Sequence, residues 1–235
     1  MENFLYETKF IDTDVCELKF VDFNEYDKVY AVKDEKQLET DLVEIKEDNK
    51  EKSIMDFLNK KFVKMAKEEG YKNREDEHIP RNEDGEIRFD IDIEKLEEEL
   101  KKHPPVDNNI ENSILRRIVA RLNMAGSWIA VNGRIGPGNF IICNESTFDY
   151  LKTTFDRISY TYFKLFADNS LEDEEIVIGR KNSLENPGII AVIDKNSLQN
   201  IVYNEDGNRC IDLSYGLYAI GFYPEKQYLT LKIKK

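Results

Sequence analysis

Residues 110–151 read IENSILRRIVARLNMAGSWIAVNGRIGPGNFIICNESTFDYL, and this stretch decides the fold. Its first part predicts an amphipathic helix over residues 109–131, with a length of about 24 residues or about 36 Å. Asn108 and Glu111 have the spacing of a capping box, and Asn132-Gly133 should end the helix. Apolar residues recur every three or four positions: Ile110, Ile114, Ile118, Leu122, Ala125 and Ile129.

A glycine-rich segment, NGRIGPGNF at residues 132–140, follows the predicted helix. It superficially resembles a phosphate-binding loop, but it lacks the Gly-Lys-Ser/Thr ending, and Pro137 has no amide to offer an anion. We therefore interpret it as a structural turn. The next residues, NFIICN, predict a compact strand, and ESTFDYLKTTF predicts a short helix that begins near Asn144.

The first half of the chain predicts mixed elements. Short apolar alternations between Phe4 and Phe23 suggest strands, and Gln37 to Lys46 has helical spacing. A second helix is predicted more clearly than the one at Gln37 to Lys46. It should start at a capping box of Ser53 and Asp56, carry a stripe of apolar residues and stop at Gly70. The stripe consists of Ile54, Leu58, Phe62 and Met65.

Two copies of the tetrapeptide NEDG, at residues 82–85 and 204–207, are typical of hairpin turns. The first leads into EIRFDIDIE, whose alternating apolar residues predict a half-buried strand. A helix that runs through Glu97 to Lys102 should then stop at Pro104-Pro105. We place a domain boundary there, between residues 1–105 and 106–235.

Charge is distributed unevenly over the 235 residues. The net charge is −13, of which residues 1–105 carry −12 and residues 106–235 carry −1. An acidic half of this kind is a poor nucleic-acid binder and is typical of a solvated surface. The chain has no run of about 18 apolar residues and no signal-peptide pattern at its start, so we expect a soluble protein. Its single, widely spaced cysteines, Cys16, Cys143 and Cys210, suggest a reducing cytoplasm.

The sequence contains few candidate catalytic residues. His78 and His103 are the only histidines, and both lie in charged segments without a nucleophile motif. Asp90 and Asp92 point the same way on the predicted strand, but no histidine accompanies them, so we interpret them as a polar face. Neither NEDG turn has the spacing of a calcium loop. We expect no enzyme activity, no cofactor and no metal.

The segment 110–151 resembles the major capsid proteins of tailed phages, in particular those of T-even-type myoviruses. Those proteins carry an amphipathic helix, an arginine and glycine turn, a strand of the form Asn-Phe-Ile-Val and a short helix opened by a polar residue. The resemblance continues through FKLFADNSLEDEEIVIGRKNSLENPGIIAVID and SYGLYAIGFYPEKQYLTLKIKK, and it covers about residues 108–235. Arg180 stands where the family commonly has Tyr, Ser214 where it has Arg, and Ile135 interrupts the turn.

The resemblance implies an α+β chain with the capsid fold of tailed phages and herpesviruses, with an axial and a peripheral domain. It implies a structural subunit of a virion shell, made in the host bacterial cytoplasm, whose partners are other copies of itself and other capsid proteins. It implies neither a small-molecule substrate, nor a membrane, nor a specific nucleic-acid sequence as a partner. The alternatives from the residues alone are a monomeric acidic adaptor that recruits a basic partner, and a metal-dependent enzyme that uses carboxylates.

Subunit contacts are expected at the glycine turn and along the helix before it. Arginine holds carboxylates bidentately, and glycine allows close backbone approach, which suits a repeated interface. Arg116, Arg117 and Arg121 lie largely off the apolar stripe and should project toward solvent or a neighbouring subunit. The predicted interface residues are Arg134, Gly136, Gly138, Asn139, Arg117 and Arg121.

Overall fold

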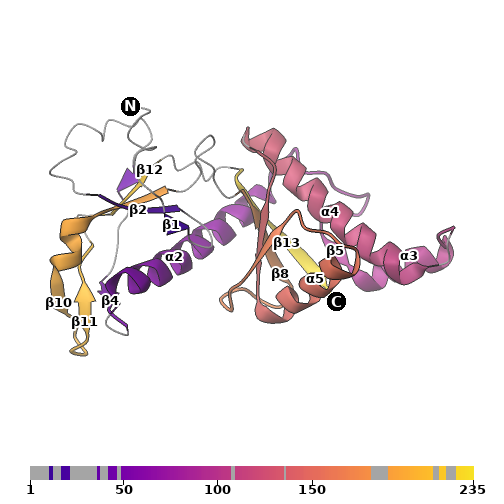
Figure 1. Ribbon diagram of the computed structural model, residues 1–235. Coiled ribbons are helices and arrows are strands. Elements are labelled where there is room, and N and C mark those ends of the chain that lie inside the picture. The colour runs from indigo at the N-terminus through magenta and orange to yellow at the C-terminus, as the bar shows by residue number, and fades with distance from the viewer. Residues whose placement is uncertain are drawn as a thin grey trace. The chain divides into compact units, whose positions relative to one another are not determined.

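A computed structural model describes residues 11–12, 17–21, 36–37, 42–46, 49–106, 109–134, 136–180, 190–213, 217–220 and 226–235. The chain forms two compact units (Figure 1). The first consists of Met1–Lys64 and Lys181–Tyr223, and the second of Met65–Arg180 and Pro224–Lys235. Helices and sheets are both present, so the α+β class is confirmed.

The first unit contains two sheets. The larger has the order β1 (Ile11–Asp12), β2 (Glu17–Val21), β9 (Ile190–Asp194), β12 (Leu217–Ile220) and β3 (Lys36–Gln37), and only its β2–β9 pair is parallel. The smaller has the antiparallel order β10 (Ile201–Tyr203), β11 (Arg209–Ile211) and β4 (Val43–Glu44), and the 3-10 helix η1 (Lys195–Gln199) precedes β10. Gly207 in the β10–β11 turn has φ +79°, which confirms the hairpin at residues 204–207.

The second unit is built on a five-stranded mixed sheet. Its order is β5 (Ile91–Asp92), β13 (Tyr228–Lys234), β8 (Glu175–Gly179), β6 (Phe140–Cys143) and β7 (Lys164–Ala167). The β13–β5 and β6–β7 pairs are parallel, and the two pairs that involve β8 are antiparallel. The predicted strand at NFIICN is confirmed as β6, which lies between β8 and β7 in the sheet.

Helices α3 (Ile93–Lys102), α4 (Ile110–Gly133) and α5 (Glu145–Arg157) share one core with this sheet. Alternate strand residues point into that core because the side chains of a strand point alternately to its two faces. The predicted apolar stripe of α4 is confirmed, since Ile114, Ile118, Leu122, Ala125 and Ile129 are buried there and Ile110 is partly buried. The strands contribute Ile141, Cys143, Ile176, Ile178, Leu229, Leu231 and Ile233.

Local capping explains the ends of α4 and α5. Asn109, rather than the predicted Asn108, caps α4, because its side chain accepts a hydrogen bond from the amide of Asn112 at 3.0 Å. Asn144 caps α5 in the same way, as predicted, through the amide of Thr147. At the end of α4, Arg134 adopts a left-handed conformation with φ 52°.

Helix α2 (Lys50–Asn73) differs from the prediction at both ends. Ser53 is not its cap, since it lies in the first turn of the helix, and its hydroxyl donates to the carbonyl of Asn49, the residue before the helix, at 2.7 Å. Gly70 does not stop the helix either. It lies inside α2 against β13, where an added Cβ would be 2.4 Å from the Thr230 hydroxyl. The absence of a side chain permits this close approach of helix and strand.

Two other predicted elements are wrong. Residues 37–46 form no continuous helix, because Lys36–Gln37 and Val43–Glu44 are the strands β3 and β4. Of the strand expected at residues 86–94, only Ile91–Asp92 is formed; Asp92 then caps α3, which starts at Ile93. The turn at residues 82–85 is confirmed by the Arg81–Ile87 bridge and by Gly85 at φ +80°.

The compact units do not follow the boundary expected at residues 105 and 106. Helix α3 does end at Lys102, before Pro104-Pro105. The second unit nevertheless contains residues on both sides of these prolines, because β5 pairs with the C-terminal strand β13 and α3 packs against α4. Long-range pairing overrides the shift in composition that suggested the boundary.

Candidate functional site

The glycine turn, of which the structure describes residues 132–134 and 136–140, begins in the last residues of α4, and its second part folds back onto that helix. The amide of Gly138 donates to the carbonyl of Gly126 on α4 at 3.0 Å. An added Cβ on the buried Gly138 would lie 2.9 Å from the Cγ2 of Ile178. Asn139 extends the sheet, since its amide donates to Gly179 at 2.9 Å and its carbonyl accepts from Lys164 at 3.0 Å. Gly138 and Asn139 thus make contacts within the chain that hold the turn in place.

Arg180 holds the turn in place through its side chain. It was not among the site residues predicted from the sequence. Its guanidinium donates to the carbonyl of Pro137 at 3.2 Å, and its Cζ lies 2.8 Å from the place of a Cβ on Gly136. Its backbone is fixed by Gln227, whose amide Nε2 donates to the Arg180 carbonyl at 3.0 Å. The only signal in the sequence was a charged residue directly after a buried strand.

An exposed surface next to the turn is formed by Arg134 and by one face of α4. Arg134 is exposed, and no acidic partner for it is found in the part of the chain that the structure describes. Val131, one turn earlier, is 75% exposed, and Met124 is 46% exposed. Residues seven apart lie on the same helix face, so α4 has an exposed face opposite its core stripe. This face consists of Ala120, Met124, Ser127 and Val131.

The structure does not bring Arg117 and Arg121 to the turn. Arg117 pairs with Glu99 of α3 at 2.7 Å, and Arg121 donates to the carbonyl of Asp90. Arg121 and Arg134 are thirteen residues apart, which is about 20 Å along a helix. The expectation that both arginines project only toward solvent or a neighbour needs correction, because α3 and the segment before β5 lie beside α4 and supply their partners.

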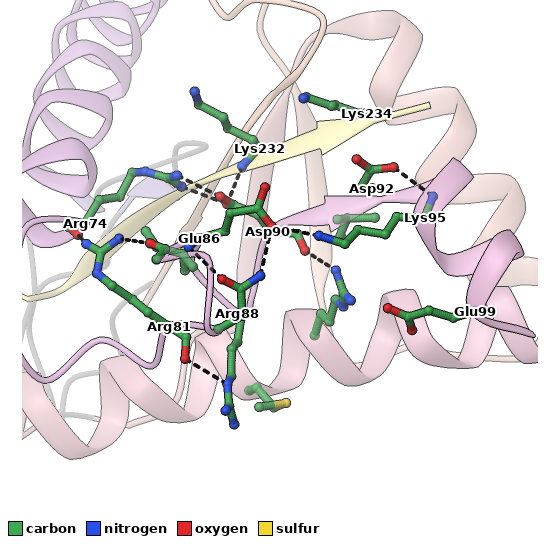
Figure 2. A pocket seen from close by; sticks show the side chains of 16 residues that line it. Arg74, Arg81, Glu86, Arg88, Asp90, Asp92, Lys95, Glu99, Lys232 and Lys234 are labelled. Atoms are coloured by element: carbon green, nitrogen blue, oxygen red, sulfur yellow. Dashed lines mark hydrogen bonds and ion pairs between the residues drawn. The ribbon is translucent and has the colours of Figure 1, made fainter.

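A second surface feature is a pocket of about 580 Å³ in the second unit (Figure 2). Asp90 lies in it and accepts from Nη1 and Nη2 of Arg74, at 2.8 and 2.7 Å, and from the amide of Lys232 at 2.9 Å. Glu86 pairs with Lys95 at 2.9 Å, and this hydrogen bond is the main cause that lowers the pKa of Glu86. The pocket is lined by Arg74, Arg81, Asn82, Gly85, Glu86, Ile87, Arg88, Asp90, Ile91, Asp92, Lys95, Glu99, Arg121, Met124, Lys232 and Lys234.

Asp90 and Asp92 both line the pocket, in agreement with their interpretation as a polar face, but they are half-buried rather than fully exposed. Asp90 is held by Arg74, and Asp92 caps α3 by accepting from the amide of Lys95 at 3.0 Å. Within the described ranges, no group of three His, Cys, Asp or Glu side chains is arranged to hold a metal ion. Both carboxylates therefore serve the fold of the segment between α2 and α3.

The other titratable candidates are held in structural roles. Burial raises the pKa of the Cys143 thiol to about 12, so the thiol stays protonated at neutral pH and is a poor nucleophile. His78 is exposed and lies 3.1 Å from Asp76. Asp76 is also bonded to Lys226 at 2.8 Å, and this contact is the main cause that lowers its pKa to about 2.

Comparison with known proteins adds no identification. No protein-family model matches the chain, and no curated protein matches it. Among the helices that the structure describes, none has the length and apolar character needed to cross a membrane.

Proposed function

We propose that this chain is a structural subunit of a phage virion shell that self-assembles through repeated contacts. The observation that carries the proposal is the arrangement of the segments on which the capsid resemblance rests. These segments supply β6, β7, β8 and β13, which are neighbours in one sheet although they span residues 140–234. Helix, glycine turn, strand and capped helix also follow one another in the order that the family shows.

The contact surface of the proposal is the exposed face of α4 together with Arg134. An exposed apolar face on a long helix favours association, since its burial removes apolar surface from water. Arg134 lies three residues after the exposed Val131 and ends α4 in a left-handed conformation. A neighbouring copy would supply a carboxylate for its guanidinium. Repetition of this pair in every copy would give the shell its register.

The test is the oligomeric state of the concentrated protein, measured by sedimentation velocity and electron microscopy. Hexamers, pentamers or sheets are expected. Arg134→Glu should shift the melting temperature by no more than about two degrees, because an exposed ion pair contributes little to folding. The same substitution should abolish assembly, since it places like charges at every contact.

The matched control is Lys152→Glu, which makes the same charge change on an exposed side chain of α5. This variant should assemble like the parent chain. Normal assembly of Arg134→Glu would contradict the contact surface while leaving shell formation intact. A parent chain that stays monomeric at all concentrations would contradict the shell function and favour the acidic adaptor.

A further inference from the structure

The pocket of Figure 2 is rich in cations on a chain that is acidic overall. Seven of its lining residues are basic and four are acidic, whereas the whole chain carries a net charge of −13. Like charges that line one pocket repel one another, so folding alone gives no reason to gather them. The excess of cations calls for an anionic ligand. We call this site the basic pocket, defined by the sixteen lining residues named above.

Each of the four carboxylates of the basic pocket already has an ion-pair or hydrogen-bond partner within the chain. Asp90 is held by Arg74 and Glu86 by Lys95, at 2.7 and 2.9 Å. Glu99 pairs with Arg117, which lies outside the lining, and Asp92 caps α3. Asp90, Glu86 and Glu99 thus each have a cationic partner, whereas Asp92 keeps its negative charge, and the lining as a whole has three more basic than acidic side chains.

Five basic side chains of the pocket have no carboxylate within ion-pair distance among the described residues. Three are arginines whose guanidinium groups donate to backbone carbonyls: Arg81 to Gly85 and Arg74, Arg88 to Arg81, and Arg121 to Asp90. A carbonyl bond orients a guanidinium without neutralising it, and each group keeps further N–H donors. The other two are Lys232 and Lys234 on β13.

These five cations are spread over the pocket. Lys232 and Lys234 are two residues apart on the same face of β13, about 7 Å along the strand. In Figure 2 they lie on the other side of Asp90 from Arg81 and Arg88. A single small ion would reach only some of them. A ligand with several linked anionic groups would reach both sets.

We infer that the basic pocket binds linked phosphate groups. Each phosphate offers several acceptor oxygens, which match the remaining guanidinium N–H donors and the lysine ammonium groups. The pocket volume of about 580 Å³ suits a small ligand. The linked phosphates come from a free oligophosphate or from a nucleic-acid backbone. This inference does not depend on the proposed shell function.

The net charge of the chain sets the conditions for binding. Negative charges elsewhere repel an anion, but the repulsion is screened beyond about 8 Å at physiological ionic strength. A compact ligand inside the pocket therefore experiences mainly the local excess of cations. Affinity should fall as salt is raised, because salt also screens the attraction.

The experiment is a calorimetric titration of the full chain with tripolyphosphate at low and at physiological salt. Saturable one-site binding is expected. The double variant Lys232→Gln/Lys234→Gln should weaken it about tenfold or more, since two charge-assisted contacts are lost. The matched control Lys101→Gln/Lys102→Gln removes the same charge from exposed residues of α3 outside the pocket and should bind normally.

Further measurements test whether the linked phosphates come from a nucleic-acid backbone, and check that the variants are folded. Arg88→Gln, on the opposite side of the pocket, should also weaken binding, and circular dichroism of each variant should match the parent. A single-stranded oligonucleotide that binds, is displaced by tripolyphosphate and is lost in the same variants would identify a nucleic-acid backbone. Lack of saturable binding, equal affinity in the pocket variants, or equal binding of hexaglutamate would overturn the inference.

Discussion

Substitution of Gly70 by alanine tests how α2 lies against the sheet of the second unit. Gly70 is in the interior of α2, where an added Cβ would be 2.4 Å from the hydroxyl of Thr230 and 2.6 Å from its amide nitrogen. Real Cβ atoms do not approach other atoms this closely, so helix or strand must shift. The sign of the stability change therefore depends on which of two effects is larger.

Helix propensity alone predicts stabilisation, by about 1 kcal/mol for Gly→Ala in a helix interior. Overpacking opposes it and costs about 1 to 3 kcal/mol. The shift would also strain the hydrogen bond from the Thr230 hydroxyl to the Lys67 carbonyl, which measures 3.1 Å and contributes about 1 kcal/mol. Thr230 pairs with Val177 in the β13–β8 ladder, and its carbonyl accepts from Arg74, so its backbone has little freedom to move. We expect a net loss of about 1 to 3 kcal/mol.

The measurement is equilibrium unfolding in urea, followed by the fluorescence of Trp128. Trp128 is the single tryptophan and is buried in the core of the second unit, so it reports on that unit. Glu68→Ala, at an exposed position of the same helix, is the control and should change stability by less than about 0.5 kcal/mol. Gly70→Ala in a Thr230→Ala background should recover only part of the loss, because the contact with the backbone nitrogen remains. A Gly70→Ala protein as stable as the parent would refute the packing of α2 on β13.

Two other predictions concern the same unit. Ile141→Asp should cost several kcal/mol, because it places an unpaired carboxylate in the core on β6, and a soluble variant with the parent's urea midpoint would count against that placement. The pKa of Asp76 is lowered from 3.8 to about 2, mainly by the Lys226 hydrogen bond and next by the His78 amide. The ionised carboxylate therefore stabilises the folded state above pH 3.8, and this stabilisation is lost as the pH falls through 2. Lys226→Met should raise the pKa of Asp76, seen by carboxyl NMR titration, and flatten the fall of the melting temperature between pH 4 and 2; an unchanged titration would exclude the ion pair.

Helix α4 shows how far local signals reach. Its apolar stripe, its asparagine cap and its glycine end all lie within the segment itself, and each was predicted to within one residue. Strand β6 and the start of α5 at Asn144 were predictable for the same reason. Capping and side-chain periodicity act over only a few residues, so they can be recognised in the sequence without knowledge of the rest of the chain.

Where a distant partner competes, local signals mislead. Val43–Glu44 lie in a segment whose apolar residues have helical spacing, but they pair with Cys210–Ile211 of β11. Ile91–Asp92 pair with Ile233–Lys234, and Asp92 then starts α3, which shortens the strand that the alternation predicted. Gly70 has the local properties of a helix stop, but the approach of β13 determines its role.

The sequence by itself determined the α+β class, the long helix before the glycine turn, the strand and capped helix after it, and both NEDG turns. The tertiary structure alone decided that Arg180 supports the turn, that Arg117 and Arg121 lie away from it, and that seven basic side chains line one pocket. The physical reason is the range of the interactions. Caps, turns and periodicity join residues a few positions apart, whereas the pocket joins Arg74, Arg121 and Lys232, which only sheet pairing and helix packing bring together.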